Sequence, residues 1–352
     1  MRTTRTAEHG RSRPRGRNRL AWALAAAGTT LAAVMLAGAL PQDGEARPAV
    51  RGGADPATTV SDHRPGDRVR HLAEREVCAD GRDPAESLAP SPDTGVAVRR
   101  IQERGELVVG VDQNSYLWGY RTPDTGKIVG FDIDLTRAIA TELLGPDPRI
   151  VLRAVPTSER VRLIQDREVD MVVRTMSITC DRWQEVAFST AYFEAGQQVL
   201  APRHSDITGF DGSLDGARVC SAEGSAAEDL LEAEGRALGA ELLHVGNHLD
   251  CLVLIQLGQA DALITDSALA AGHAAQDPGM HLIGDPLTLE PYGVAMHLDD
   301  TDLVRRVNRA LEDFRGGGAD SGWQQAYGSW LAAHMDHANG SAPAPPDPLY
   351  RD

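Results

Sequence analysis

The chain has 352 residues, a formal net charge of −16 and 42% hydrophobic residues. This length allows one or two packed cores, and the acidic balance excludes a nucleic-acid binder that relies on general positive charge. Aromatic residues make up only 5% of the chain, and no basic stripe alternates with stacking side chains, so a single-strand nucleic-acid binder is excluded as well.

The N-terminal 40 residues have the pattern of an export segment. Arginine dominates residues 1–19, and an uncharged apolar run extends from Leu20 to Leu40. This order predicts a signal peptide or a signal anchor over 1–40, with the rest of the chain outside the cytoplasmic membrane. Ala37-Gly38-Ala39 is a candidate cleavage site, so cleavage and anchoring both stay open.

The segments on either side of the folded region lack a hydrophobic period. Residues 41–95 are rich in Pro, Gly, Asp and Arg and predict a linker or N-terminal arm. Residues 333–352 contain a proline-rich run and predict a disordered tail.

Short apolar runs alternate with helical stripes between these segments. Such alternation predicts parallel sheets with helices on both faces, and the series occurs twice, which gives two α/β lobes. The expected strands are Leu107–Val111, Ile150–Leu152 and Met171–Val173 in the first series, and Arg218–Val219, Leu242–Val245 and Ala262–Ile264 in the second.

The expected domain division follows from the two series. Lobe 1 comprises 96–198 and 296–332, and lobe 2 comprises 199–295. The extended segments Gln197–Ala201 and Tyr292–Met296 are expected to join the lobes as hinge strands. The ligand cleft is expected between the lobes, where the C-terminal ends of the strands face inward.

The four cysteines are Cys78, Cys180, Cys220 and Cys251. An even number in an exported chain favours two disulfides, and three pairings are possible. Cys220 ends an expected strand and Cys251 begins an expected helix of the same lobe, so we predict Cys220–Cys251 and therefore Cys78–Cys180. No spacing typical of a metal site is present, and we expect neither a metal nor another cofactor.

Seven short stretches follow one another along the folded region: Leu107–Asp112, Gly130–Leu135, Val169–Val172, Ser177–Arg182, Phe188–Tyr192, Gly224–Ser225 and Ala260–Asp266. In their order and spacing they resemble the family-3 extracellular solute-binding proteins, which serve polar amino-acid ABC transporters. The resemblance covers about residues 100–331, and the variants Val111–Asn114 and Arg174–Arg182 are nearest to actinobacterial glutamine/glutamate-binding proteins of the GlnH type. It implies a type II periplasmic-binding-protein-like fold, with two α/β lobes joined by two hinge strands and the ligand between them.

The resemblance assigns residues to a zwitterionic ligand, which needs an anion donor and a cation acceptor close together. Arg182 is implied to bind the α-carboxylate as a bidentate fork, with Ser177 as a second donor. Asp266 is implied to receive the α-ammonium, together with the backbone carbonyl of Thr175. A loop arginine on the surface and an aspartate that only caps a helix are the simpler readings of Arg182 and Asp266.

The start of a helix is a further expected contact. Ser225 and Ala226 follow a glycine, so their N–H groups are expected to form an anion site reinforced by the helix dipole. A plain helix cap is the alternative.

Arg174 departs from the family pattern, in which a small residue is usual. It follows the apolar run 171–173, so we expect it at the mouth of the cleft, free to pair with a ligand carboxylate and to favour glutamate or aspartate. An ion pair with a protein carboxylate is the alternative. Asp112 is also expected at the ligand, Tyr116 and Trp118 as a lid or as packing residues, and Arg121 and Arg160 as weaker candidates for the role of Arg174.

The function predicted from these residues is binding, not catalysis. We expect a monomer that captures a small polar amino acid and delivers it to a membrane ABC transporter permease, or to a membrane sensor. Glutamate or aspartate is the first expectation for the ligand, and glutamine or asparagine is the alternative. A cyclohexadienyl dehydratase-like enzyme on the same fold is the alternative. It would need a general acid or base over the ligand, and no histidine or glutamate is expected there.

Overall fold

The structure is a computed structural model, and it describes residues 76–335 and 343–352. The expected export segment, 1–40, and residues 41–75 of the expected arm lie outside the described residues. In the described part of the chain, no helix combines the length and the apolar character needed to cross a bilayer. The described residues belong to one compact unit.

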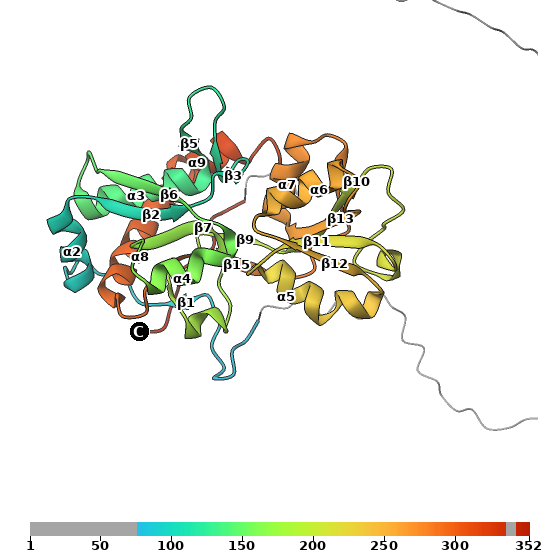
Figure 1. Cartoon of the computed structure of the whole chain (residues 1–352). Coiled ribbons are helices and arrows are strands. Elements are labelled where there is room, and N and C mark those ends of the chain that lie inside the picture. Colours follow the sequence, from blue (N-terminus) through green and yellow to red (C-terminus); the bar gives the residue numbers. More distant parts are fainter. Residues whose placement is uncertain (1–75, 336–342) are drawn as a thin grey trace, which may run out of the picture. The chain divides into compact units, whose positions relative to one another are not determined.

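The first lobe is built on a sheet with strand order β6-β2-β7-β15-β8, and β9 pairs with β15 (Figure 1). β2 runs parallel to β6 and β7, whereas β15 is antiparallel to β7, β8 and β9. The strands are β2 Leu107–Val111, β6 Ile150–Ala154, β7 Met171–Ser177, β8 Ala187–Phe188, β9 Phe193–Ala195 and β15 Glu290–Met296.

Helices cover both faces of this sheet because successive strand residues point to opposite sides. Met171 and Val173 face a core shared with α2, α3, α8 and α9, and Val172 faces a second core shared with α4. The helices are α2 Val96–Arg104, α3 Phe131–Leu144, α4 Arg160–Gln165, α8 Thr301–Arg315 and α9 Gly322–Trp330, with 3-10 turns η1 Thr157–Glu159, η2 Arg182–Gln184 and η5 Gly318–Asp320. A small sheet of β3 Asn114–Ser115, β4 Gly119–Arg121 and β5 Ile128–Val129 lies on the same lobe.

The second lobe has a sheet with strand order β12-β11-β13-β10-β14. Val219 and Ile264 face a core with α5, and Cys220 and Leu263 face a core with α6 and α7. The elements are β10 Gln197–Pro202, β11 Arg218–Ala222, β12 Glu241–Val245, β13 Ala262–Asp266, β14 Met280–Ile283, α5 Ala226–Ala233, α6 His248–Gln256, α7 Ser267–Gln276, η3 Gly212–Leu214 and η4 Gly235–Leu238.

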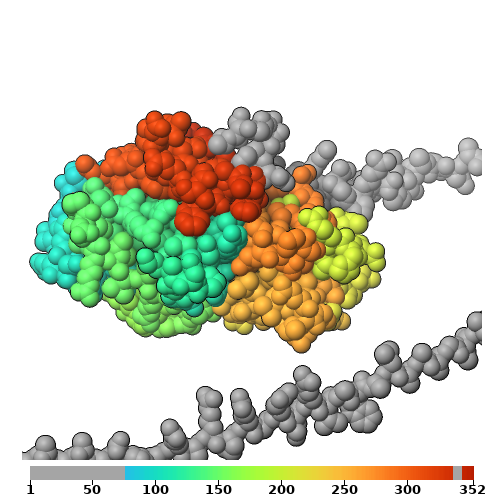
Figure 2. Space-filling view, turned by 90° about the horizontal axis from the view of Figure 1, so that it is seen from above, coloured from blue at the N-terminus to red at the C-terminus, as the bar shows by residue number. Residues whose placement is uncertain are grey.

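The two-lobed α/β fold expected from the sequence is confirmed. Figure 2 shows the yellow and orange residues of the second lobe in direct contact with the green residues of the first. Because the carboxyl ends of β7 and β13 both reach this junction, polar residues at the ends of buried strands gather there.

The lobe boundaries differ in part from the expected division. The first crossing lies at Gly196, between β9 and β10, close to the expected position. The second lies in residues 284–289, because β15 pairs along its length with β9, β7 and β8 of the first lobe. Tyr292–Met296 is therefore a strand of the lobe 1 sheet and not a hinge strand, and lobe 2 ends before Glu290. A sequence pattern does not tell which sheet an apolar strand joins.

Both ends of the described chain are fixed to the first lobe. In the arm, β1 (Glu86–Ser87) pairs in parallel with β16 (Leu349–Tyr350) of the expected disordered tail. Residues 343–352 are thus ordered, which corrects the expectation of disorder for this part of 333–352. Backbone pairing and the ion pair between Arg305 and Asp352 supply the order that composition did not indicate.

The two predicted disulfides are confirmed. Cys78–Cys180 links the arm to the first lobe with a Cα–Cα distance of 5.4 Å, and Cys220–Cys251 links β11 to α6 with a Cα–Cα distance of 5.6 Å.

The two crossings touch at Gly196, which gives a test of the hinge. A Cβ at this position would lie 1.8 Å from the Thr288 carbonyl oxygen of the other crossing. We expect Gly196→Ala to force the crossings apart and to lower the Tm by about 5 °C or more. Gly212→Ala, where a Cβ meets nothing within 4 Å, is the control and should leave the Tm within about 2 °C. Equal melting temperatures for the two variants in calorimetry would contradict the close approach.

Candidate ligand-binding site

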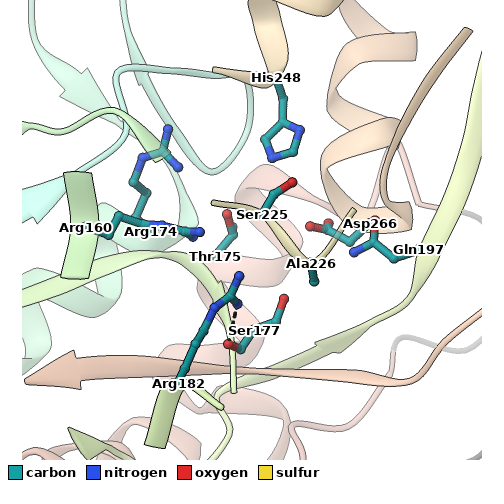
Figure 3. Close-up of a pocket in the computed structure, with 10 residues that line it drawn as sticks. All are labelled: Arg160, Arg174, Thr175, Ser177, Arg182, Gln197, Ser225, Ala226, His248 and Asp266. Carbon is teal, nitrogen blue, oxygen red and sulfur yellow. Dashed lines mark hydrogen bonds between the residues drawn. The ribbon is translucent and has the colours of Figure 1, made fainter. Parts of the chain in front are cut away.

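A small polar cavity lies between the lobes (Figure 3). Its free volume is about 10 Å³, room for about one water molecule, so a larger ligand needs the lobes to separate or the side chains to rearrange. Figure 3 shows guanidinium, imidazole, hydroxyl, amide and carboxylate groups around one space. The lining residues are Arg160, Arg174, Thr175, Ser177, Arg182, Gln197, Ser225, Ala226, His248 and Asp266.

Arg182 lies in η2, directly after the segment that follows β7, and its side chain is buried. One terminal nitrogen donates to the Ser177 carbonyl at 2.7 Å and the other to the Gly224 carbonyl of the second lobe at 3.0 Å. Burial lowers the pKa of the guanidinium, and no carboxylate is paired with it among the described ion pairs. Its remaining N–H groups suit an incoming anion, so it is not a surface arginine.

A second arginine binds the same carbonyl. Arg160 donates to the Gly224 oxygen at 2.8 Å and to the Thr157 oxygen at 2.9 Å. Burial, followed by the charges of Arg182 and Arg174, holds its pKa well below the usual value. Arg160, a weaker candidate from the sequence, therefore lies in the cavity.

The expected helix start is present at α5, but one of the two backbone amides expected to bind an anion already donates a hydrogen bond within the protein. The Ser225 N–H donates to the Ala222 carbonyl at 3.2 Å, and the Ser225 hydroxyl caps the helix by accepting from the Glu228 N–H at 3.2 Å. The Ser225 N–H is therefore not an anion donor in this conformation. The amide of Ala226, the first residue of α5, remains at the positive end of the helix.

Asp266 serves both as a helix cap and as a cavity residue. It ends β13, lines the cavity, and accepts the Leu269 N–H at 2.9 Å as the N-cap of α7. Burial raises the pKa of its carboxyl to about 7, and the nearby Glu290 charge also raises it. A buried carboxylate in this state gains from a cationic group placed against it.

Thr175 has a backbone conformation that β-branched residues rarely adopt, with φ at 40°. The register of β15 against β7 shifts between Gly293 and Ala295, opposite this region. The Thr175 N–H is held by the Asp132 carboxylate at 3.0 Å and by the Tyr192 hydroxyl oxygen at 3.1 Å. A strained backbone conformation persists where the surrounding contacts hold it, and these two hydrogen bonds hold Thr175 at the cavity wall.

Arg174 is not the spare cation that the sequence suggested. It forms an ion pair with Asp112 at 3.0 Å and donates to the Asn247 side-chain oxygen of the second lobe at 3.2 Å. The cause is strand register: Gly110 of β2 lies opposite Val172 of β7, so Asp112 and Arg174, each two residues further along these parallel strands, come close together. Arg174 thus has a protein carboxylate as its partner, and the pair lies within the first lobe.

Asp112 itself is outside the cavity lining. Its carboxylate accepts the N–H groups of Gln113 and Asn114 at 2.7 and 2.9 Å, and the Ser115 hydroxyl at 2.7 Å. With Arg174 as a fourth partner, it positions the arginine and the turn after β2 and does not reach the ligand space directly.

The hydroxyl of Ser177 is engaged at the hinge. It donates to the buried Glu290 carboxylate at 2.6 Å, so in this conformation it is not a donor for a ligand carboxylate. Glu290 also accepts the Gln197 side-chain amide at 2.9 Å and the Thr288 hydroxyl at 3.0 Å. Gln197 and Glu290 begin the strands that follow the two crossings, so this cluster connects the hinge to the cavity wall.

The expected lid residues lie elsewhere. Trp118 is fully buried in the core of the first lobe and donates to the Ala268 carbonyl at 3.1 Å. Tyr116 packs against Tyr120 and His334, and Arg121 is an exposed residue bonded to its own hairpin. They are packing and surface residues because the turn after β2 folds back onto its own small sheet.

Two cavity residues were missed by the sequence. His248 begins α6, and its buried Nδ1 has no hydrogen-bond partner. Burial, together with the neighbouring His273, Arg174 and Arg160, holds its pKa well below the usual value, so the ring is neutral. His248 therefore corrects the expectation that no histidine lies at the cleft, and Gln197 is the second cavity residue that the sequence did not indicate. The place of His248 directly after the expected strand 242–245 was the available signal.

Known proteins with similar sequences are solute-binding proteins, in agreement with a cavity that is lined by charged and polar groups. Residues 107–333 match the model for bacterial extracellular solute-binding proteins, family 3. The chain is 32% identical to the ABC transporter glutamine-binding protein GlnH of Bacillus subtilis, over 66% of this chain and 83% of that protein. It is 35% identical to the glutamine-binding protein of Geobacillus stearothermophilus, over 60% and 80%, and 29% identical to the glutamate-binding protein GluB of Corynebacterium efficiens, over 60% and 74%.

Similar solved structures are also of amino-acid-binding proteins. An ancestral arginine-binding protein bound to arginine superposes with a TM-score of 0.60 at 30% identity, over 65% of this chain and 99% of that one. An ancestral amino acid-binding protein, described as a precursor of cyclohexadienyl dehydratase, superposes with a TM-score of 0.60 at 26% identity, over 67% and 100%.

The buried carboxyl of Asp266 gives a test by pH. Above pH 3.8 it is ionised in the unfolded chain, but in the ligand-free fold it stays protonated up to about pH 7, so its cost to folding grows across this window. Asn does not titrate and still caps α7. We expect Asp266→Asn to stabilise the ligand-free protein by a few kcal/mol more at pH 8 than at pH 4.5, measured by denaturant unfolding. A stability difference that does not change with pH would contradict the raised pKa.

Proposed function

The chain belongs to the bacterial extracellular solute-binding proteins, family 3, and from this premise we propose that it captures a small polar amino acid outside the cytoplasmic membrane and delivers it to a membrane ABC transporter. One observation supports this above the others: Arg182 of the first lobe and Asp266 of the second line the same cavity. A zwitterion satisfies both groups at once, its carboxylate at the arginine and its ammonium at the aspartate.

Ligand capture and closure of the two lobes are then coupled. A ligand that touches both lobes binds the closed form more tightly than the open form and shifts the population toward it. The Gly224 carbonyl, held by Arg160 and Arg182, already brings the lobes together at the cavity. The closed form is what a membrane partner would recognise, whether that partner is a permease or a sensor.

Glutamine is the proposed ligand ahead of glutamate. The argument for an acidic side chain rested on an unpaired Arg174, and this charge is neutralised by Asp112. A neutral ion pair and a neutral His248 suit an uncharged amide, which both donates and accepts hydrogen bonds. The two relatives named for glutamine support the same order.

An enzyme is the second candidate, because His248 places an imidazole with an unpartnered nitrogen at the cavity. The resemblance to the precursor of a dehydratase points in the same direction. Against it, the buried ring is surrounded by arginines that keep it unprotonated, which disfavours a general acid.

A panel of amino acids tests the proposal. In calorimetric titrations we expect glutamine to bind most tightly and glutamate more weakly. Arginine should be rejected, because its side chain would add a cation to a cavity already lined by Arg160 and Arg182. Arg182→Ala should abolish binding of all of them. Tight arginine binding would overturn the proposed ligand class, and turnover of prephenate or arogenate by the same preparation would favour the enzyme.

A charge change at Asp112 tests the order of glutamine and glutamate. Asp112→Asn keeps an oxygen for the neighbouring amides but leaves Arg174 without its counter-ion. We expect the ratio of the two dissociation constants to move toward glutamate by about tenfold or more. Asp166→Asn, at an exposed carboxylate paired with Arg162, is the control and should leave the ratio unchanged. The same ratio in both variants would show that Arg174 does not sense the ligand side chain.

A further inference from the structure

The turn that carries Arg182 is held from outside by two segments that lie beyond the family match. The match covers residues 107–333, whereas the arm occupies 76–95 and the tail 343–352. Within the described residues, these two segments contact the positions on either side of Arg182.

The arm contacts this turn at both ends. Cys78 forms the disulfide with Cys180, two residues before Arg182. The Pro84 carbonyl accepts the indole N–H of Trp183, the residue after Arg182, at 2.7 Å. Ser87, in β1, donates to the Phe188 carbonyl at 2.6 Å, and the Phe188 ring packs against Trp183 with ring centres 5.6 Å apart.

The tail covers the other side of Trp183. The Arg351 guanidinium carbon lies 5.1 Å from the centre of the indole ring, a cation–π contact. β16 holds Arg351 in place by pairing with β1, and the Arg351 N–H donates to the Ser87 carbonyl at 3.0 Å. Asp352 accepts the Ala89 N–H at 2.6 Å and pairs with Arg305 of α8.

We propose that the arm and the tail together form a brace that positions Arg182 for the ligand carboxylate, with Trp183 and Arg351 as the positioning residues. The inference rests on the proposed function, because it takes Arg182 as the carboxylate-binding group. The physical reason lies in the length of η2: a three-residue 3-10 turn has almost no stability of its own, so the direction of its arginine depends on what holds the turn.

The brace acts on affinity through preorganisation. A guanidinium already fixed toward the cavity loses less freedom when an anion arrives, and that saving appears as tighter binding. The arm and tail do not touch the cavity, whose lining lies entirely between residues 160 and 266. Their effect on binding must therefore pass through the turn.

Two variants separate the contacts of the brace. Trp183→Phe keeps an aromatic face for Arg351 but removes the N–H donated to Pro84 together with part of the ring, and Arg351→Ala removes the cation–π contact. Arg236→Ala is the matched control, since it removes an exposed arginine that pairs with Glu232 on the other lobe. The dissociation constant for glutamine is measured by calorimetry well below the unfolding temperature, and the Tm is recorded for each variant.

We expect Trp183→Phe and Arg351→Ala each to weaken glutamine binding by about threefold to tenfold, and the control by less than about twofold. In an Arg182→Lys background, where binding is followed by NMR titration up to millimolar concentrations, Arg351→Ala should have little further effect. If both brace variants lower the Tm but bind glutamine like the wild type, or if their effect persists unchanged in the Arg182→Lys background, the brace is only structural and the inference is wrong. If Arg182→Lys alone binds like the wild type, the proposed role of Arg182 fails first.

Discussion

One carbonyl oxygen, that of Gly224, accepts hydrogen bonds from two buried guanidinium groups of the opposite lobe. This contact joins the two lobes directly at the cavity. Gly224 has a φ of 70°, which favours glycine, and a Cβ there would lie 3.2 Å from the Ser158 Cα, so any other residue would strain the turn and press it away from the first lobe. The arginines reach it because η2 and α4 both begin near the carboxyl ends of the lobe 1 strands.

Buried arginines that are bonded only to carbonyl oxygens are costly, because a neutral oxygen compensates a lost hydration shell less well than an anion does. Arg160 and Arg182 are in this situation, and Asp266 is the converse case of a buried carboxyl without a cation. The cavity is therefore unfavourable as it stands and favourable once a zwitterion fills it. Ligand binding then supplies the counter-charges that these arginines and Asp266 lack in the ligand-free protein.

The sequence predicted the fold class, both disulfides and the positions of Arg182 and Asp266 in the cavity. These follow from local signals: alternating apolar runs, a strand end followed by a polar residue, and the resemblance that these stretches carry. The pairing of Arg174 with Asp112 depends on strand register, and the membership of β15 in the first lobe depends on long-range pairing. His248 lies at the start of a helix and Glu290 at the start of a strand. A linear pattern does not show where the side chains at such positions point. Composition predicted a disordered tail over 333–352 and missed β16, since a short strand fixed by a distant partner has no signature of its own.

The path of the chain has a consequence for how the protein assembles. Lobe 2 is one continuous stretch between the two crossings, whereas lobe 1 takes its strand β15, its helices α8 and α9 and the tail from residues that come after lobe 2. During synthesis the second lobe can complete its core from neighbouring residues, while the first must wait for the end of the chain to supply an inner strand of its sheet. Until then the edge of β7 stays open, and a truncated chain would expose it. The pairing of β16 with β1 likewise joins segments from opposite ends of the described chain, and the entropy cost of closing such a loop grows with its length.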